Sequence, residues 1–215
     1  MWVLLSNHLG DLASGTWMSL RLTGVGFSCA LVLGVVLATF RISPIAPLRF
    51  VGFVYVEIFR NIPVMSLIIL LVYALPGINI KLGFEPSVFA ALALVGGSFV
   101  CEALRSGINS IDKGQVEAAR SIGLGFTGVL GHVVFPQAFR AMVQPLVTIA
   151  IAIFLSSSMA AIVGVEDLTL MTNRINNQDA LGLITFIASA IIYVIISLTV
   201  AWVGSIIERR VRLVR

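Results

Sequence analysis

The sequence is poor in charge. Only 11% of its 215 residues are charged, lysine occurs only at Lys81 and Lys113, and 59% of the residues are hydrophobic. A soluble domain of this length could not hide so much apolar surface in one core, so an ordinary soluble protein is excluded. The net charge of +4 does not indicate nucleic-acid binding, because no Lys- and Arg-rich stripe with interleaved aromatic residues occurs. The composition instead predicts an integral membrane protein.

Cysteine and the common catalytic motifs are also scarce. Cys29 and Cys101 lie in apolar runs without metal-type spacing, which excludes a disulfide framework or a zinc site. Neither lysine belongs to a G-x-x-x-x-G-K-[ST] sequence, so the chain has no phosphate-binding loop of its own. His8 and His132 have no partner pattern around them, and we predict that both are solvated. We therefore expect no enzyme activity, no metal and no cofactor in this chain.

Long apolar runs are the main feature that is present. Crossing about 30 Å of hydrocarbon takes about 20 residues of helix. Five runs meet this length, at about 16–40, 48–75, 86–104, 139–165 and 181–207. The second run is interrupted near its start by the polar stretch EIFRNIP. Because the five runs use nearly the whole chain, we predict one all-α integral membrane domain over residues 1–215 with five transmembrane helices.

The charged loops predict the orientation of these helices, because Lys and Arg near span ends resist translocation. If the first loop is cytoplasmic, basic residues gather on that side: Arg41, Arg49, Arg105, Lys113, Arg120, Arg140, Arg209, Arg210, Arg212 and Arg215. The other side keeps only Lys81 and Arg174, together with the acids Glu85, Glu166, Asp167 and Asp179. The asymmetry predicts an external N-terminus and a cytoplasmic C-terminus.

The stretch GQVEAARSIGLG, Gly114 to Gly125, is the longest polar interruption and predicts a short cytoplasmic helix over about 114–126. At 100° per residue one side of this helix is apolar: Val116, Ala118, Ala119, Ile122 and Phe126. Glu117, Arg120 and Ser121 share the other side, with Glu117 and Arg120 spaced to form an i,i+3 ion pair. Gly114 and Gly125 suit its two ends. Amphipathicity alone leaves two interpretations, a helix that merely joins two spans at the interface and a helix that docks a partner.

The spacing beyond this helix carries a family resemblance. Glu117-Ala118-Ala119, three residues, Gly123, nine residues, then Val133, one residue and Phe135-Pro136 resemble the EAA loop of ABC-importer permeases. Val133 and Phe135 stand where that loop has Ile and Leu. The resemblance implies a coupling helix that inserts into a groove on an ATPase subunit. The residues it assigns to ATPase coupling are Gly114, Gln115, Glu117, Ala118, Ala119, Arg120, Gly123 and Gly125.

Three further stretches resemble the polar amino-acid uptake family of these permeases: EIFRNIP, CEALRSGINSIDKGQVEAARSIGLG and FPQAFRAMVQPL. The residues in these stretches are most similar to those of glutamate-uptake permeases. The resemblance implies the type I importer fold in a bacterial cell (inner) membrane, with glutamate as the favoured substrate and glutamine or aspartate as alternatives. It also implies three kinds of partner: a second permease subunit, a paralogue rather than a copy; two ATP-binding cassette subunits, which bind ATP and Mg; and an extracellular or periplasmic solute-binding protein.

One departure from the family concerns the end of the fourth span. Leu155 stands where the family usually has lysine, in a region that lies near the translocation path in related importers. Ser156, Ser157 and Ser158 follow it and cover most of the helix circumference, so at least one should face the bundle interior. We take these serines as candidates for the substrate path. The alternative is that each only bonds a carbonyl of its own helix.

Two pairs of charges lie within predicted spans, where a charge is costly unless it finds a partner. Glu57 and Arg60 are three residues apart, and so are Glu102 and Arg105. We expect both pairs to be structural and to hold the cytoplasmic gate region together. Direct substrate binding by these charges is the less favoured alternative.

Other functions remain open at this stage. A secondary transporter is usually built from internal repeats, and none is visible across the five spans. A homo-oligomeric channel would carry a filter motif or a ring of charge. A membrane enzyme or a purely structural subunit would not require the spaced EAA pattern. ATP-driven transport by partner subunits is the function that the pattern favours.

Overall fold

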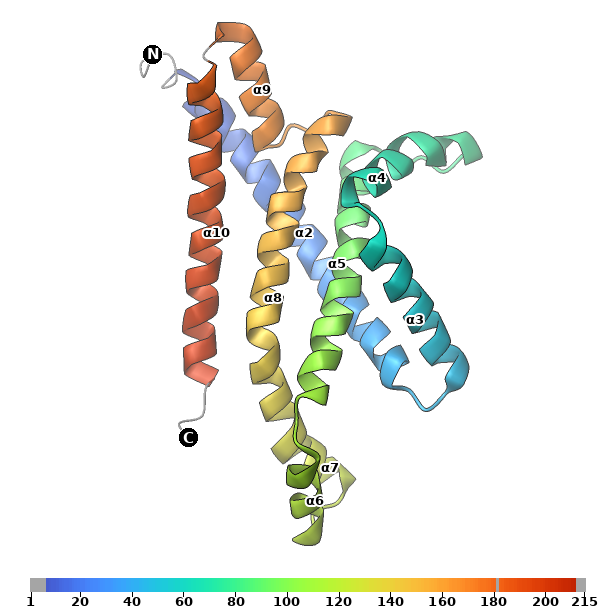
Figure 1. Ribbon diagram of the computed structural model, residues 1–215. Helices are drawn as coiled ribbons and strands as arrows, with labels where there is room; N and C mark the ends of the chain where they lie inside the picture. Colours follow the sequence, from blue (N-terminus) through green and yellow to red (C-terminus); the bar gives the residue numbers. More distant parts are fainter. Residues whose placement is uncertain (1–6, 181, 212–215) are drawn as a thin grey trace.

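The computed structural model describes residues 7–180 and 182–211, which fold into helices joined by short loops (Figure 1). The first half consists of α2 (Leu9–Ile42), α3 (Ala46–Asn61), α4 (Val64–Ile69), a π turn η1 (Leu70–Ala74), a 3-10 turn η2 (Leu75–Ile78) and α5 (Phe84–Asn109). The second half consists of α6 (Lys113–Ser121), α7 (Phe126–Val129), a π turn η3 (Leu130–Val134), α8 (Phe135–Ser157), a 3-10 turn η4 (Ser158–Val163), α9 (Leu168–Asp179) and α10 (Leu183–Val211). The described residues contain no strand, which confirms the predicted all-α fold.

Four helices are long and apolar enough to span a membrane, and a bent pair makes a fifth span if it is counted as one, which agrees with the five that the sequence predicts. Four are long apolar helices: α2, α5, the continuous run Phe126–Val163 and α10. The fifth is a broken pair, α3 followed by Val64–Ile78, with a bend of 101° between its halves. Ile62 is extended at the break because the residue before a proline avoids the helical region, and Pro63 has no N–H to continue the helix. The sequence places the interruption near the start of this span, whereas the structure places it at the end of α3.

α5 is the centre of the bundle and α10 is at its edge. The most apolar window of α5 is 61% buried, whereas that of α10 is 11% buried. Glycines allow the backbones near α5 to approach closely, as is usual in membrane bundles. A methyl group added at Gly34 of α2 would overlap Val100 of α5, and one at Gly96 of α5 would lie 2.9 Å from Ala30 of α2. These contacts make α2 and α5 the rigid core of the subunit.

The two ends of the bundle differ, and we name them by their helices. At the α6 end, α6 and α7 project beyond the tips of the long helices, whereas α9 closes the opposite end, the α9 end (Figure 1). The described basic residues that the sequence assigns to the cytoplasm all lie toward the α6 end, at the tips of long helices or on α6. Arg212 and Arg215 of that set lie outside the described residues.

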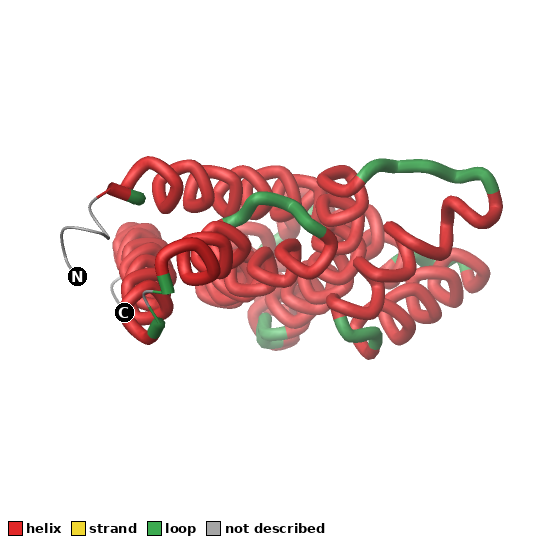
Figure 2. The backbone as a smooth tube through the Cα atoms, turned by 90° about the horizontal axis from the view of Figure 1, so that it is seen from above, coloured by secondary structure: helices red, strands yellow, loops and turns green. Residues whose placement is uncertain are grey.

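The bundle is long and narrow in cross-section. α2 has 34 residues and would measure about 51 Å at 1.5 Å per residue, longer than the hydrocarbon core, and it runs diagonally behind the other helices (Figure 1). Seen from above in Figure 2, the described helices form an elongated bundle and not a closed ring.

Candidate functional site

The helix predicted over about 114–126 is α6, Lys113–Ser121, and its two ends have clear physical causes. The side chain of Asp112 accepts the Gly114 N–H at 2.7 Å, which caps the N-terminus. At the other end the Leu124 and Gly123 amides donate to Ala119 and Arg120 carbonyls at 3.1 and 3.0 Å. This Schellman motif needs a left-handed residue, which Gly123 supplies with a φ of +90°. Gly123 therefore ends the helix, and the expectation that Gly125 does so is wrong, because Gly125 begins α7.

The predicted apolar face of α6 does not all turn toward the bundle. Ala119 is its buried residue and Val116 is partly buried, whereas Ala118 is exposed. Beyond the end of the helix, Ile122 is 80% exposed and Phe126 is 68% exposed. A single chain thus presents two large apolar side chains to its surroundings at the tip of the α6 end.

Glu117 and Arg120 do not form the predicted ion pair. Among the described residues, neither side chain makes a hydrogen bond or an ion pair. Both line a groove of about 370 Å³ with Lys113 and Val116, between α6, the end of α5 and η3. Two opposite charges beside an apolar tip are thus left free to meet charges of a partner.

Gln115 is the polar residue of α6 that does find a partner. Gln137 Nε2, in the first turn of α8, donates to Gln115 Oε1 at 2.7 Å. The sequence assigns Gln115 to the coupling set but gives no indication of Gln137 as its partner.

Glu102 joins three helices rather than one. Its Oε1 accepts from Arg41 Nη1 of α2 at 2.9 Å, and the Arg105 guanidinium of its own helix lies at 3.6 Å from the same oxygen. The guanidinium carbon of Arg41 also lies 5.5 Å from the centre of the Phe53 ring of α3. Arg41 is the partner of Glu102 that the sequence missed, since the two residues are 61 positions apart in the chain.

The second charge pair is present but lies elsewhere. Arg60 Nη2 lies 3.6 Å from Glu57 Oε1 in the last turns of α3. Because α3 starts at the α6 end and rises about 1.5 Å per residue, Arg60 lies about 21 Å from its first residue, beside the bend. The pair is therefore not at the α6 end, where the sequence places the gate, and both side chains are about 40% exposed.

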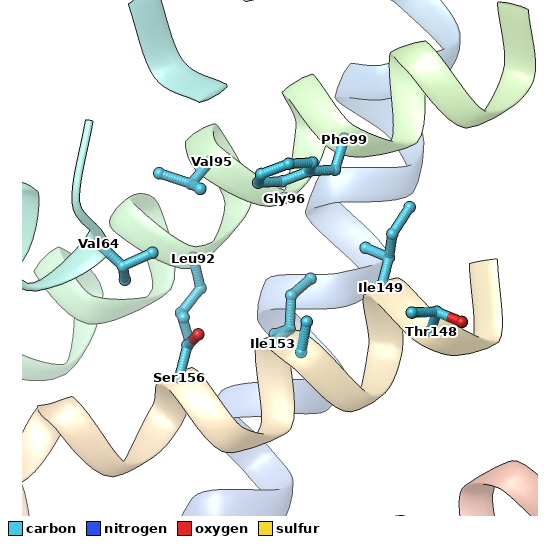
Figure 3. Close-up of a pocket in the computed structure, with 10 residues that line it drawn as sticks. Val64, Leu92, Val95, Gly96, Phe99, Thr148, Ile149, Ile153 and Ser156 are labelled. Atoms are coloured by element: carbon cyan, nitrogen blue, oxygen red, sulfur yellow. The ribbon is translucent and has the colours of Figure 1, made fainter. Parts of the chain in front are cut away.

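The three serines face in different directions. Ser157 is fully buried and donates to the Phe154 carbonyl at 2.7 Å, and Ser158 donates to the Leu155 carbonyl at 2.7 Å. Ser156 makes no hydrogen bond among the described residues. It lines a cavity of about 270 Å³ between Val64, α5 and α8 (Figure 3). The other lining residues are Leu92, Val95, Gly96, Phe99, Thr148, Ile149, Ala152 and Ile153, so the walls are apolar apart from two hydroxyl groups.

Comparisons with known proteins agree with this architecture. Residues 30–213 match the family described as binding-protein-dependent transport system inner membrane component. The chain belongs to this family. It is 35% identical over 175 residues to a probable glutamine ABC transporter permease protein, GlnP, of Bacillus subtilis, covering 81% of this chain and 80% of that protein. It is 34% identical over 197 residues to the glutamate transport system permease protein GluC of Corynebacterium efficiens, covering 85% and 86% of the two chains.

A solved structure gives the same result for the fold. A crystal structure of an amino acid ABC transporter with histidines superimposes with a TM-score of 0.92 at 27% identity, covering 98% of each chain. The predicted resemblance to ABC amino-acid permeases and the predicted importer permease fold are thereby confirmed. The inner membrane component described here is thus a multi-span protein, and its family is not one of catalytic subunits.

The α9 end of this inner membrane component contains a further group that the sequence missed. His8 Nδ1 lies 3.0 Å from Asp11 Oδ2, and His8 Nε2 lies 2.5 Å from Asp179 Oδ2 at the end of α9. The prediction that His8 is solvated without a partner is wrong. The hydrogen bonds to Asp11 and then to Asp179 raise the pKa of the imidazole above its ordinary value. His8 therefore ties the start of α2 to the end of α9.

α9 is fixed at its other end by a buried carboxylate. Asp167 is fully buried, and its Oδ1 accepts the Leu170 N–H at 2.9 Å as the N-cap of α9. Its Oδ2 lies 3.4 Å from the Tyr193 hydroxyl of α10, and Ser19 of α2 accepts the Leu168 amide at 3.2 Å. Burial raises the pKa of this carboxyl. The sequence counted Asp167 as an ordinary external acid, whereas the structure shows it capping α9 and joining α9 to α10.

Proposed function

We propose that this chain is the membrane subunit of an ABC importer that moves a polar amino acid into the cytoplasm, driven by ATP hydrolysis on partner subunits. The observation that carries the proposal is the projecting α6 helix, with free Glu117 and Arg120 beside exposed Ile122 and Phe126. Charges left unpaired next to an apolar tip are suited to specific docking, in which the apolar groups supply affinity and the charges set the register. The family match supports this role for the helix.

The orientation follows from charge. Basic residues gather at the α6 end, and loops rich in Lys and Arg stay in the cytoplasm. The α6 helix therefore faces the cytoplasm, where ATP is available, and the N-terminal start of α2 with α9 faces outward. The proposed orientation has the N-terminus outside and the C-terminus in the cytoplasm of a bacterial inner membrane protein.

Three kinds of partner complete the importer. Two ATP-binding cassette subunits dock on the α6 helices and bind ATP and Mg, since this chain has no phosphate-binding loop. A second permease subunit, a paralogue in preference to a copy, completes the path, because five spans are too few to enclose one alone, and the bundle in Figure 2 is elongated. A solute-binding protein delivers the substrate at the α9 end, where α9 exposes a polar face with Asn173, Arg174 and Asn177.

Glutamate is the favoured substrate, with glutamine or aspartate as alternatives. The support comes from the relatives, one of which is described as a glutamate permease and another as a probable glutamine permease. Of the three serines, Ser156 is the best candidate for the path, because its free hydroxyl faces the cavity of Figure 3. Leu155 does not line that cavity and is 48% exposed, so the lysine usual in the family would stand on the outer surface of this subunit.

The mechanism requires α6 to transmit motion. When the ATPase subunits close, rigid-body movement of the docked helix shifts the spans between discrete packings, because packed interfaces do not deform continuously. Glu102, bound to Arg41 and Arg105 at the α6 end, is placed to hold α2, α3 and α5 together during that shift. Glu57 and Arg60 lie beside the bend between α3 and α4 and stabilise that bend instead.

The test is affinity purification of the tagged chain from its native host in mild detergent, followed by mass spectrometry. We expect an ATP-binding cassette protein, a second permease and a solute-binding protein in the eluate. Glu117→Arg should reduce recovery of the ATPase, and Gly123→Ala should uncouple ATP hydrolysis from uptake, because a left-handed alanine costs about 1–2 kcal/mol. Gly131→Ala is the matched control, since Gly131 lies outside the coupling set, has no positive φ, and an added methyl group there meets no atom within 4 Å.

Two results would contradict the proposed function. If the chain elutes only with copies of itself in several detergents, a homo-oligomeric channel becomes the better interpretation. If Glu117→Arg and Gly123→Ala both leave uptake and ATP hydrolysis unchanged, α6 is not the coupling element.

A further inference from the structure

Two routes connect α6 to α8, and they differ in stiffness. The route along the chain passes through the turn at Gly123, the short helix α7 and the π turn η3, Leu130–Val134. Left-handed glycine turns are permissive, and π turns are places where helices bend. Motion of α6 can therefore be absorbed along this route before it reaches α8.

The second route is a direct link between side chains. Gln115 is the third residue of α6 and Gln137 is the third residue of α8, and Gln137 Nε2 donates to Gln115 Oε1 at 2.7 Å. Over residues 7–180 and 182–211, no other side-chain hydrogen bond or ion pair joins α6 to a different long helix. Packing adds little to this link, since Ala119 is the one buried residue of α6.

Through α8, the Gln115–Gln137 hydrogen bond is connected to the cavity that Ser156 lines. α8 is one continuous helix from Gln137 to Ser156, with Pro145 inside it, and the 19 residue steps between them span about 28 Å at 1.5 Å per residue. Thr148, Ile149, Ala152 and Ile153 on the same helix line the same cavity. A displacement of Gln115 that is passed to Gln137 therefore moves one wall of the cavity directly.

We propose that the Gln115–Gln137 amide pair is the strut that transmits motion of α6 to α8, bypassing the flexible turn and η3. Both are positioning residues, acting through α8, and the inference rests on the proposed function of α6. Loss of one neutral hydrogen bond shifts a two-state equilibrium by about two- to tenfold, and we expect a loss of that size in the number of substrate molecules transported per ATP.

The experiment uses the complete importer, with its ATPase, second permease and solute-binding protein, reconstituted in liposomes. Uptake of radiolabelled L-glutamate and L-glutamine and release of phosphate are measured together, which gives the coupling ratio. Gln137→Glu keeps one amide facing one carboxylate, so this variant should stay coupled. The double variant Gln115→Glu/Gln137→Glu sets like charges against each other and should lose coupling two- to tenfold, whereas Gln115→Glu/Gln137→Lys should restore it.

Gln144→Glu is the matched control, because Gln144 is an exposed glutamine of α8 whose side chain makes no bond among the described residues. It should keep the coupling ratio of the unmodified complex. If the like-charged double variant transports as many molecules per ATP as the unmodified complex, the proposal that Gln115 and Gln137 form a strut is wrong. The proposed function still stands in that case, because the ATPase still co-purifies. If the opposite-charge pair fails to rescue coupling, the strut is also wrong. Absence of any ATPase from the unmodified complex would instead overturn the proposed function.

Discussion

Replacing Arg41 by methionine removes the closest partner of Glu102 while keeping an unbranched apolar stem of about the length of the arginine stem. The Arg41 side chain is 10% exposed and its guanidinium lies 2.9 Å from Glu102 Oε1, whereas Arg105 is 40% exposed and lies at 3.6 Å. The two arginines therefore differ in burial and in distance from the same oxygen. The structure predicts that Arg41 contributes more to stability than Arg105, although both are basic residues near one acid.

The size of the difference follows from burial. Breaking a buried ion pair costs about 3–5 kcal/mol, and breaking an exposed pair costs about 0–1 kcal/mol. Because the Glu102 side chain is 31% exposed, water solvates part of its orphaned charge, and we expect Arg41→Met to cost about 2 kcal/mol. Loss of the contact with Phe53 adds about 0.5 kcal/mol. Arg105→Met should cost about 0.5 kcal/mol.

The assay is thermal unfolding of the purified complex in detergent, followed by tryptophan fluorescence. For a chain of this size 1 kcal/mol shifts the midpoint by about 2–4 °C, so Arg41→Met should lower it by about 5–10 °C and Arg105→Met by about 2 °C. A double-mutant cycle with Glu102→Gln should give a coupling energy of about 1–2 kcal/mol for Arg41 and near zero for Arg105. Equal shifts for the two arginines, or a larger shift for Arg105, would refute the reasoning.

Three further outcomes are expected. Gly34→Ala should destabilise the subunit by about 1–3 kcal/mol, since its methyl group overlaps a valine of α5, whereas Gly24→Ala on the same helix meets no atom within 4 Å and should be neutral in the same unfolding assay. The raised pKa of His8 means that its bond to Asp179 stabilises the folded protein fully below the unfolded pKa of about 6.5 and is lost as pH rises through the higher folded value. After correction for its intrinsic pH dependence, amide hydrogen exchange at the end of α9 should therefore rise above about pH 6.5 in the native protein. The His8→Ala variant should show no such rise. The same pH profile in both proteins would contradict this prediction. Ser156→Ala should raise the KM for uptake about two- to tenfold without changing the unfolding midpoint, and an unchanged KM would remove this residue from the path.

The coupling segment shows how far sequence reasoning reaches. The EAA spacing located the helix and named Glu117 and Gly123, because chain-local chemistry decides where a short helix lies, but the predicted end at Gly125 was wrong, since Gly123 ends the helix. It did not show that Ile122 and Phe126 remain exposed or that Glu117 and Arg120 stay unpaired. Those properties depend on how close α5 and η3 come to α6, and a periodic pattern carries no information about that distance.

The polar groups of the bundle show the same limit. Local i,i+3 spacing suggested that Glu102 pairs with Arg105, and it does so at 3.6 Å, but the shorter contact comes from another helix. His8 and Asp179 lie 171 positions apart, so no window of sequence relates them. Among the serines, rotation of α8 against α5 decided that Ser156 faces the cavity and Ser157 is buried.

The sequence by itself determined that the protein lies in a membrane, where its apolar spans fall and which family it belongs to, and its charges predict the orientation of the spans. These properties follow from transfer free energies, from the length of helix that spans a bilayer and from motifs contiguous in the chain. Only the tertiary structure decided the 101° break in the second span, the Arg41–Glu102 contact, the link between Gln115 and Gln137 and the buried cap at Asp167. Each of these depends on the angle and separation at which helices distant in the chain pack, which the close contacts of glycine and neighbouring side chains set in three dimensions.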